Sequence, residues 1–526
     1  MAENKNLNHI SKEKFSFVHD GERISDKKFD DKPIGSFKDA WIRFRKNKAS
    51  VVASIIIISI ILFSFLAPVL ITNHDAKFLC TNYAKLPGRV AALQPYGFLD
   101  GGVEREPSDS AFLKLVAMGA GAESFDGHTV TIAEAMASDY QPILEEGETF
   151  TRELPGKKFA TYHPSRIDAY LEKGFIYRDI EQSELQNILD WQEKTGLQIL
   201  YPLVENNEWN PDPNDANYWY KAKARGAMPV NLNAAGKAKE IEYTPDAHFE
   251  DNYVRDENGN VVYWKYMGGG TFETAQLRIR VLYYNYYQYL YGSTPDYILG
   301  TDSQGYDLAL RIAKGIQLSL LISVCVCVIN FFIGAIYGAI EGYYGGWVDM
   351  IMERISDILS GVPFIIVATL FQMHLASKLG PVPCLLFAYV VTGWIGTAHR
   401  VRTQFYRFKH QEYVMAARTL GAKDSRIIWK HIFPNTLGTL ITSSALAIPS
   451  TILSESMLSF LGIVKLGGAD SISLGTLLAD AQGIWTLYPH LMLYPAIIIS
   501  LLMICFNLFS NGLRDAFNPA LRGVEE

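Results

Sequence analysis

The residues of this chain that could take part in catalysis or metal binding are few and scattered. Four histidines lie between residues 73 and 305: His74, His128, His163 and His248. No two of them have the spacing of a metal-binding pair. The acidic stretch NPDPNDAN, residues 210–217, lacks the central glycine of a calcium loop, and Lys223 stands where such a loop needs a bidentate glutamate. We therefore expect no metal site.

Motifs for covalent catalysis and for nucleotide binding are also missing from the sequence. The chain has neither a G-x-S-x-G nucleophile elbow nor a G-x-x-x-x-G-K-[ST] phosphate loop. We expect no catalytic residue, no cofactor and no nucleic-acid partner. If ATP drives this protein, another polypeptide must bind it.

One stretch between two apolar runs has the residue types of a protein contact. Residues 411–435 read QEYVMAARTLGAKDSRIIWKHIFPN and are basic and amphipathic. The spacing predicts a short helix over 411–420 with one shared face, made by Tyr413, Ala416, Ala417 and Leu420. The small alanines would let another protein's surface approach closely.

A glycine divides this stretch into two parts. Gly421 is the residue best able to leave helical geometry. Asp424 or Ser425 can then cap a second helix, which we expect Pro434 to end. Such an element could be a lever that a cytoplasmic protein pushes. From the residues alone, a helix lying on anionic lipid headgroups is an equal alternative.

The elements that must position this stretch are membrane spans. Six apolar runs are long enough to cross a bilayer, at 49–72, 315–340, 358–377, 380–398, 437–462 and 487–510. The mean hydropathy of the 526 residues is only +0.05, because a long polar segment separates the first run from the other five. We expect an all-α membrane domain of six transmembrane helices.

Two basic clusters fix the expected orientation. The tail 1–48 ends in a cluster of four basic residues, Arg43, Arg45, Lys46 and Lys48. By the positive-inside rule this tail is cytoplasmic. Six crossings then return both the basic loop 399–436 and the C-terminal tail 511–526 to the cytoplasm.

The same count leaves residues 73–297 outside the cell as an insert domain. Between residues 73 and 305 there are 34 acidic and 21 basic residues, and Cys80 is the one cysteine, so no disulfide framework is possible there. Residues 165–173 and 180–196 have helical spacing, with Gly196 as a C-terminal stop. Residues 256–267 read as a turn feeding a strand, and 275–281 alternate like a strand. We expect a mixed α/β domain with a docking or shielding role.

The 411–435 stretch resembles the EAA loop of ABC importer permeases, whose pattern is Glu-Ala-Ala, three residues, Gly and a later Ile-x-Leu-Pro. The positions that fit are Ala416, Ala417, Gly421 and Pro434. Met415 stands where the glutamate is usual, although Glu412 lies one turn earlier. His431 and Phe433 replace the isoleucine and the leucine.

Further motifs resemble the C-type permease subunit of the dipeptide/oligopeptide group. In chain order they are FKDAWIRFRKNKASVVASIIIISIILFSFLAPVL, LGTDSQGYDLALRIAKGIQLSLLISV, EGYYGGWVDMIMERISDILSGVP, TGWIGTAHRVR, SESMLSFLG and FNLFSNGLRDAFNPALR. The resemblance covers about 1–72 and 298–526, and the second range includes the expected permease core 298–510. The insert is atypical of the group, so nothing about it is carried over.

The resemblance implies a subunit of an ATP-driven peptide importer in a prokaryotic plasma membrane. A homologous permease would complete the channel, two ATPase subunits would drive it, and an extracellular binding protein would deliver the peptide. The implied coupling residues are Glu412, Tyr413, Ala416, Ala417, Arg418, Leu420, Gly421, Ala422 and Pro434.

Some residues in the apolar runs can be interpreted either as part of a translocation path or as structural contacts. Glu455 lies in the fifth run, where a carboxylate is costly unless it faces water, a partner or the bundle interior. It could line or gate a translocation path, together with Pro449 and Trp394, or make a structural hydrogen bond between spans. At the start of the third run, a charged group is typical of an interfacial network: Glu353, Arg354 and Asp357.

Two other classes of protein compete with the transporter. A membrane-anchored receptor or sensor would bind a ligand with the insert, but it would favour one or two spans and leaves the ordered motifs of 298–526 unexplained. A membrane-tethered extracellular enzyme is disfavoured because the insert has no catalytic motif.

Overall fold

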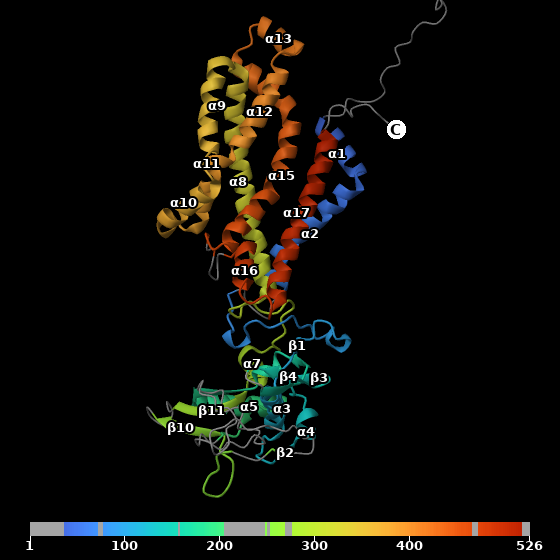
Figure 1. The fold of residues 1–526 in the computed structure, drawn as a ribbon, viewed down its shortest axis with the longest axis vertical. Helices are drawn as coiled ribbons and strands as arrows, with labels where there is room; N and C mark the ends of the chain where they lie inside the picture. Colours follow the sequence, from blue (N-terminus) through green and yellow to red (C-terminus); the bar gives the residue numbers. More distant parts are fainter. Residues whose placement is uncertain are drawn as a thin grey trace, which may run out of the picture.

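The computed structural model describes residues 36–71, 77–155, 158–204, 248–249, 253–268, 276–464, 466 and 472–517. Within these ranges the chain forms a bundle of long helices at one end and a smaller domain of strands and short helices at the other (Figure 1). His74 and the 210–217 stretch lie outside the described residues.

The bundle is made from both ends of the chain. The N-terminal part gives α1 (Ser36–Lys46) and α2 (Lys48–Leu70). The C-terminal part gives α8 (Leu308–Tyr344), α9 (Gly346–Ser360), α10 (Phe364–Leu379), α11 (Pro381–Gly393), α12 (Ile395–Phe408), α13 (Glu412–Thr419), α14 (Asp424–Arg426), the π-helix η7 (Ile427–Ile432), α15 (Phe433–Phe460), α16 (Leu474–Ala481) and α17 (Pro489–Phe517). The central helix is α8, which packs against α2, α11, α12, α15 and α16.

Small residues let α8 and α12 approach closely, as helices do in membranes. A Cβ at Gly338 would lie 2.2 Å from the carbonyl oxygen of Ala398, and one at Gly334 would lie 2.7 Å from that of Trp394. Larger side chains at these two positions would force the helices apart.

Five helical segments of the described residues are long and apolar enough to cross a membrane. They are Lys48–Leu70, Leu308–Tyr344, Pro381–Phe408, Asp424–Phe460 and Pro489–Phe517. The pair α9 and α10 makes a sixth if it counts as one span, but it is bent by 69°. The predicted run 358–377 is therefore wrong as one straight helix. Pro363 restricts the residue before it away from helical geometry, which breaks the helix after Ser360.

The helical segments differ in length from the predicted runs. The predicted run 315–340 is the centre of α8, which extends beyond it at both ends. The predicted run 487–510 begins two residues before α17, which extends past it to Phe517. The expected C-terminal tail therefore begins as helix, up to Phe517, and the expected N-terminal tail contains α1.

The segment between α2 and α8 contains both helices and strands, as its pattern predicted. Its helices are α3 (Asp109–Glu123), α4 (Ile132–Met136), α5 (Gln182–Thr195) and α7 (Tyr283–Tyr291). The 3₁₀-helices are η3 (Thr81–Tyr83), η4 (Gln94–Tyr96) and η5 (Leu171–Lys173). Its strands are β1 (Gly102–Arg105), β2 (Val130–Thr131), β3 (Ile143–Glu146), β4 (Phe150–Leu154), β5 (Lys158–Tyr162), β6 (Ser165–Asp168), β7 (Phe175–Glu181), β8 (Leu200–Tyr201), β9 (His248–Phe249), β10 (Trp264–Gly268) and β11 (Gln276–Leu282).

The strands of the insert form small antiparallel sheets. One has the order β1-β6-β3, and another has the order β10-β11-β7 with β8 also paired to β11. Two further pairs are β2 with β9 and β4 with β5. The register of β11 on β7 runs without a break from Gln276 opposite Glu181 to Leu282 opposite Phe175.

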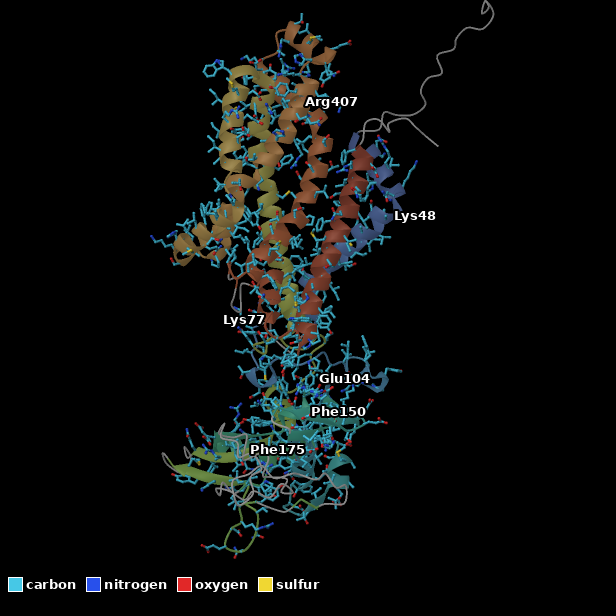
Figure 2. All side chains as sticks on the ribbon, in the orientation of Figure 1. Lys48, Lys77, Glu104, Phe150, Phe175 and Arg407 are labelled. Carbon is cyan, nitrogen blue, oxygen red and sulfur yellow. The ribbon has the colours of Figure 1, made fainter. Side chains whose placement is uncertain are left out.

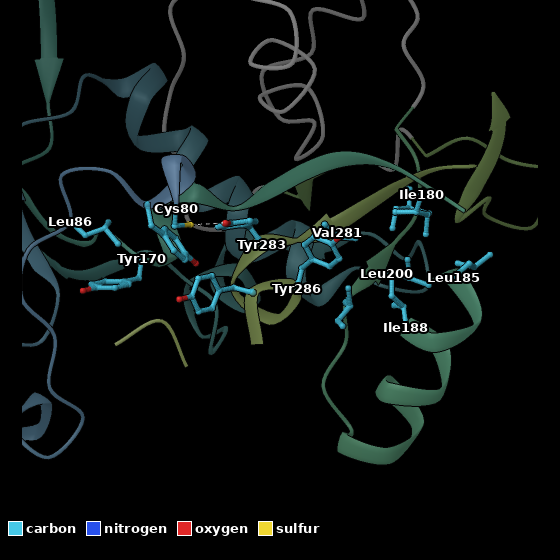
Figure 3. Packing of buried hydrophobic residues seen from close by; sticks show 14 of the residues in the cluster. Cys80, Leu86, Tyr170, Ile180, Leu185, Ile188, Leu200, Val281, Tyr283 and Tyr286 are labelled. Atoms are coloured by element: carbon cyan, nitrogen blue, oxygen red, sulfur yellow. Dashed lines mark hydrogen bonds between the residues drawn. The ribbon is translucent and has the colours of Figure 1, made fainter. Parts of the chain in front are cut away.

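The insert has a core rich in tyrosine. One cluster of buried side chains includes residues of α5, β7, β11 and α7, and within it the Cys80 thiol lies 3.0 Å from the Tyr283 hydroxyl (Figure 3). Helix α7, which precedes α8 and is rich in tyrosine, is thus largely a packing element: Tyr283, Tyr286 and Tyr287 are buried.

The predicted elements of the insert are confirmed except for one. Helix α5 ends at Gly196, which adopts a left-handed φ of 74° as expected. The strands predicted near 264 and 276 are β10 and β11. The helix predicted over 165–173 is wrong, because residues 165–168 are the central strand β6, paired on both sides.

Residues 80–89 and 297–307, here called the insert junction, connect the insert to the bundle. The Lys85 amide donates to the Asp302 carbonyl at 2.9 Å, and the Thr301 amide donates to the Leu86 carbonyl at 3.0 Å. Gly300 has a φ of +84°, and a Cβ there would lie 2.0 Å from the Leu86 oxygen. The two segments are therefore in close backbone contact.

A buried ion pair fixes the insert junction to α8. One carboxylate oxygen of Asp302 accepts backbone amides of its own turn, and the other lies 3.2 Å from Nε of Arg311. Both residues are buried, and the Arg311 guanidinium lies 4.5 Å from the centre of the Tyr306 ring. Asp307 caps the start of α8 by accepting the amides of Ala309 and Leu310.

Candidate functional site

Helix α13 lies at the end of the bundle opposite the insert (Figure 1), on the side marked by Arg407 in Figure 2. The break after it is confirmed at Gly421, which has a φ of +81°. A Cβ at this glycine would meet nothing within 4 Å, so the backbone conformation and not the available space requires a glycine.

One buried side chain anchors α13 to the bundle. Val414 is fully buried in a cluster with Ala339 of α8, Phe405 of α12 and Ile428 of η7. Burying a valine contributes roughly 1.5–3 kcal/mol. Val414 was not among the predicted coupling residues, although its position opposite the alanine face could have identified it.

Polar contacts from the end of α8 hold the turn after α13. The Tyr343 hydroxyl donates to Oδ1 of Asp424 at 2.6 Å and accepts from Arg418 at 3.4 Å. Lys409 donates to the Gly342 carbonyl at 3.0 Å, and partial burial lowers the pKa of its ammonium group. The prediction that Asp424 or Ser425 caps the second helix is wrong: Lys423 occupies the N-cap position, and the Asp424 carboxylate accepts from Tyr343.

The second helix does not end at Pro434. Residues 424–460 form one helical segment, in which η7 inserts a wider π-helical stretch before α15. Pro434 lies in the first turn of α15, where its missing amide is tolerated. The turn at Gly421 is therefore joined to a membrane-spanning helix by helical structure throughout.

The surface of α13 that faces away from the bundle is apolar. The side chains of Leu420, Met415 and Tyr413 are 88%, 53% and 40% exposed. Ala416 is exposed between them. We call these four residues the α13 tip. Tyr413, Ala416 and Leu420 share the outer face as their spacing predicted, while Ala417 is only half-buried behind them.

The other predicted coupling residues surround the α13 tip. Glu412, Arg418, Gly421 and Pro434 are exposed, and Ala422 is half-buried against the cluster around Val414. Asn435 donates to the Tyr413 hydroxyl at 3.1 Å, which connects α13 to the start of α15. The structure thus brings all nine predicted coupling residues to one end of the bundle.

A charge cluster lies between the helices beneath α13. Arg402 of α12 binds Asp349 of α9, with Nη2 2.9 Å from Oδ2. Its guanidinium also lies 3.3 Å from Glu353 and 3.4 Å from Glu341 of α8. The predicted network at the start of the third run therefore includes Glu353, but it is centred on an arginine from another helix.

Glu455 faces neighbouring helices of its own chain. The residue is 1% exposed, and its carboxylate accepts from Ser319 of α8 at 3.2 Å and from Ser459 at 3.0 Å. Ser319 also accepts the Leu474 amide at 3.4 Å, at the start of α16. These contacts favour the structural reading of Glu455, as a residue that joins α8, α15 and α16.

Trp394 and Glu455 do not lie in one site. Trp394 packs on Tyr337, 4.5 Å between ring centres, while Glu455 contacts Ser319. These two contacts are 18 residues apart on α8, which separates them by roughly 27 Å along the helix. Pro449 is buried inside α15.

A cleft of about 800 Å³ opens where the insert meets the bundle. Its walls are acidic and basic residues of β1, β3 and β6, and Leu487 contributes from the turn before α17. Glu104, one of the lining residues, is labelled in Figure 2. Among the described residues, no group of three or more His, Cys, Asp or Glu side chains is arranged to hold a metal ion.

Comparisons with known proteins cover both ends of the chain. Residues 35–85 match the family model of the N-terminal TM domain of oligopeptide transport permease C. Residues 330–523 match that of the binding-protein-dependent transport system inner membrane component. Neither match includes residues 86–329.

Individual relatives of this chain are named as permease proteins of peptide transport systems. The oligopeptide transport system permease protein OppC of Bacillus subtilis is 40% identical over 227 residues, which are 43% of this chain and 73% of that protein. The dipeptide transport system permease protein DppC of Bacillus subtilis is 40% identical over 233 residues, 43% of this chain and 70% of that protein. OppC of Escherichia coli is 37% identical over 233 residues, 43% and 75% of the two chains.

Among solved structures, a chain of the inward-facing MetNI methionine ABC transporter is similar to 39% of this chain and 96% of its own length. The TM-score is 0.33 at 15% identity.

Proposed function

The chain belongs to the family of oligopeptide and dipeptide ABC transport permeases, and from this premise we propose that it is one membrane subunit of an ATP-driven peptide importer. It is a multi-pass membrane protein with at least five apolar helices among its described residues. In the proposal it crosses a prokaryotic plasma membrane six times, with the α9–α10 pair as the bent third span. Both termini and α13 face the cytoplasm, and the insert faces outside.

The observation that carries the proposal is the α13 tip. An apolar surface that is exposed at the end of the bundle and connected through η7 to a membrane-spanning helix is suited to another protein's groove. We propose that the α13 tip seats in an ATPase subunit, one of two in the complete importer. Closure of the ATPases on ATP would then move α13, and the helical connection through η7 would pass this movement to α15.

We further propose that this chain and a homologous permease form the translocation path between them. Glu455, Pro449 and Trp394 remain the proposed residues of this path in the present chain. Glu455 would support the path without lining it, by holding α16 against α8 and α15. Pro449 would loosen the backbone of α15, where its ring removes one helical hydrogen bond.

The insert, in this proposal, docks the extracellular binding protein that delivers the peptide. Its position beyond the ends of α8 and α17 supports this role (Figure 1), as does its acidic composition. The chain itself would carry out no catalysis, because ATP would be bound and hydrolysed by the partner subunits.

The experiment is co-purification of ATPase subunits with three forms of the full chain: wild type, Gly421→Pro and Gly421→Asn. Proline fixes φ near −65° and cannot adopt the φ of +81° found here, whereas asparagine tolerates the left-handed region. We expect wild type and Gly421→Asn to retain the ATPases and peptide-stimulated hydrolysis, and Gly421→Pro to lose one or both. If wild type retains no ATPase in a gentle detergent, α13 is a lipid-surface helix and the proposal is wrong.

A further inference from the structure

The loop 90–99 of the insert is an exposed apolar surface in an otherwise highly charged domain. Its ten residues, VAALQPYGFL, include no charged side chain. Tyr96 is 82% exposed and Phe98 is 64% exposed. Ala91, Ala92 and Pro95 are exposed beside them. Exposed apolar patches of this kind on a folded domain mark an interaction surface.

The loop is held in a fixed shape. The Val90 amide donates to the Leu99 carbonyl at 2.8 Å, which closes its base. An arginine of β6, Arg166, donates to the Gly97 carbonyl at 3.0 Å. Leu99 adopts a φ of 49°, which is unfavourable for a residue other than glycine and persists because the surrounding contacts hold it. The aromatic side chains are thus presented by a built element.

Contacts at the base of the loop place it beside the ends of the membrane-spanning helices. The Arg89 amide donates to the Tyr297 carbonyl at 2.8 Å, eleven residues before the start of α8. A Cβ at Gly88 would lie 2.6 Å from the carbonyl oxygen of Ile298, which is itself 47% exposed.

The permease part also exposes apolar side chains where it meets the insert. The cleft that contains Arg166 is also lined by Leu487, in the turn before α17. Leu487 is 70% exposed, and Trp485 in the same turn is 53% exposed. The Lys85 ammonium lies 5.5 Å from the centre of the Tyr488 ring. In Figure 1 the blue segment after α2 accordingly runs between the bundle and the strands of the insert.

We propose that loop 90–99 is a membrane anchor, whose Tyr96 and Phe98 insert into the interfacial region of the lipid leaflet next to the insert. Tyrosine and other aromatic side chains favour this region, where an apolar ring can be buried while a hydroxyl stays hydrated. The surface continues that of the spans, since the turn before α17 and Ile298 before α8 expose apolar side chains too. The anchor fixes the tilt of the insert relative to the bilayer and does not depend on the transported solute.

The test is spin-label accessibility in the full chain, reconstituted alone in phosphatidylcholine nanodiscs. Labels are placed at Phe98→Cys and Tyr96→Cys, with Tyr266→Cys on β10 as the matched control. Tyr266 is a 58% exposed aromatic residue on a strand of the insert remote from the bundle (Figure 1). Wild type, treated in parallel, gives the background from the five native cysteines. Unchanged thermal unfolding midpoints confirm that each labelled chain is folded.

We expect collisions with oxygen, which partitions into lipid, to exceed collisions with a water-soluble nickel chelate several-fold more at positions 96 and 98 than at 266. Equal ratios at all three positions would overturn the proposal, because the loop would then be in water. Low accessibility to both probes at 96 and 98 would also overturn it, because protein from a second copy or another segment would cover the loop.

Discussion

The two ends of the membrane bundle are built in different ways. At the α13 end, one buried valine and a few side-chain hydrogen bonds hold a short helix, and the most exposed side chain is a leucine. At the insert junction, backbone hydrogen bonds, glycines in close backbone contact and a buried ion pair connect two chain segments to α8. The first end leaves apolar surface for a partner, whereas the second joins its two segments to each other and to α8 through buried polar contacts.

This difference teaches which end is suited to move when a partner pushes it and which end is suited to stay fixed to α8. A helix that contacts its bundle through few side chains can shift when a partner pushes it. The insert junction has no comparable freedom, because its polar groups would lose buried partners if the segments separated. The following predictions test this contrast, from the largest expected effect to the smallest.

Breaking the ion pair of the insert junction gives the largest expected effect. Asp302→Ala removes the carboxylate that lies 3.2 Å from the buried Arg311 guanidinium, and removing one partner of a buried pair costs about 3–5 kcal/mol. We expect a fall of this size in the free energy of unfolding, measured by denaturant titration in detergent. The control is Gln304→Ala, two residues away and exposed, which should change the value by less than about 0.5 kcal/mol. Equal effects of both variants would contradict a rigid junction.

The insert junction should also respond to pH through Asp307. Burial raises the pKa of this carboxyl to about 6, above its ordinary value of 3.8. The folded state then binds the proton more tightly than the unfolded state, so this stabilisation is complete below pH 3.8 and is lost as the pH rises through about 6. A pKa raised from 3.8 to about 6 corresponds to a free energy on the order of 3 kcal/mol.

Asp307→Asn isolates this contribution, because asparagine can still cap α8. The difference in unfolding free energy between wild type and the variant should change across pH 4 to 6, with wild type relatively less stable at the higher pH. A difference that is constant over this range would show that the Asp307 carboxyl does not titrate with a raised pKa.

At the α13 end, Tyr343→Phe should have a small effect on stability and a larger one on coupling. The change removes a hydroxyl that donates to Asp424 and accepts from Arg418, and one such hydrogen bond is worth about 1 kcal/mol. We expect peptide-stimulated ATP hydrolysis to fall while the unfolding free energy changes by about 1 kcal/mol or less. A large loss of stability with unchanged hydrolysis would reverse the contrast between the two ends.

The smallest effect is expected for Met415→Glu, which restores the acid usual in the EAA pattern. Met415 is exposed, so the stability should change by less than about 0.5 kcal/mol. We also expect unchanged peptide-stimulated hydrolysis, because Glu412 already supplies a carboxylate one turn earlier. A clear gain in hydrolysis would show that the missing acid limits coupling in this chain.

Local signals predicted much of this molecule. Gly421 and Gly196 were predicted to end helices, and both have left-handed φ values, because this conformation depends on the glycine itself. Five of the six apolar runs overlap the helices long enough to cross a membrane, because the hydrophobicity of about 20 consecutive residues is also a local property of the sequence. The order of motifs also predicted the family of the permease part, which the comparisons confirm.

Predictions failed where distant residues decide the structure. The helix predicted at 165–173 is a strand because β1, about 60 residues earlier in the chain, pairs with it. Pro434 does not end its helix because η7 and the surrounding cluster keep the chain helical. The role of Tyr343 in holding α13 could not be read locally, since it comes from α8, about 80 residues before Asp424.

The central claim is that the α13 tip engages an ATPase subunit, and its most direct test is peptide-stimulated ATP hydrolysis by the reconstituted importer carrying Leu420→Asp. Leu420 is 88% exposed, so a charge there should leave folding intact but oppose burial in a partner's groove. Phe159→Asp, a similar change at a 71% exposed residue of the insert, is the control. We predict loss of stimulated hydrolysis for Leu420→Asp alone, with unfolding midpoints unchanged. Full hydrolysis in Leu420→Asp would contradict the claim.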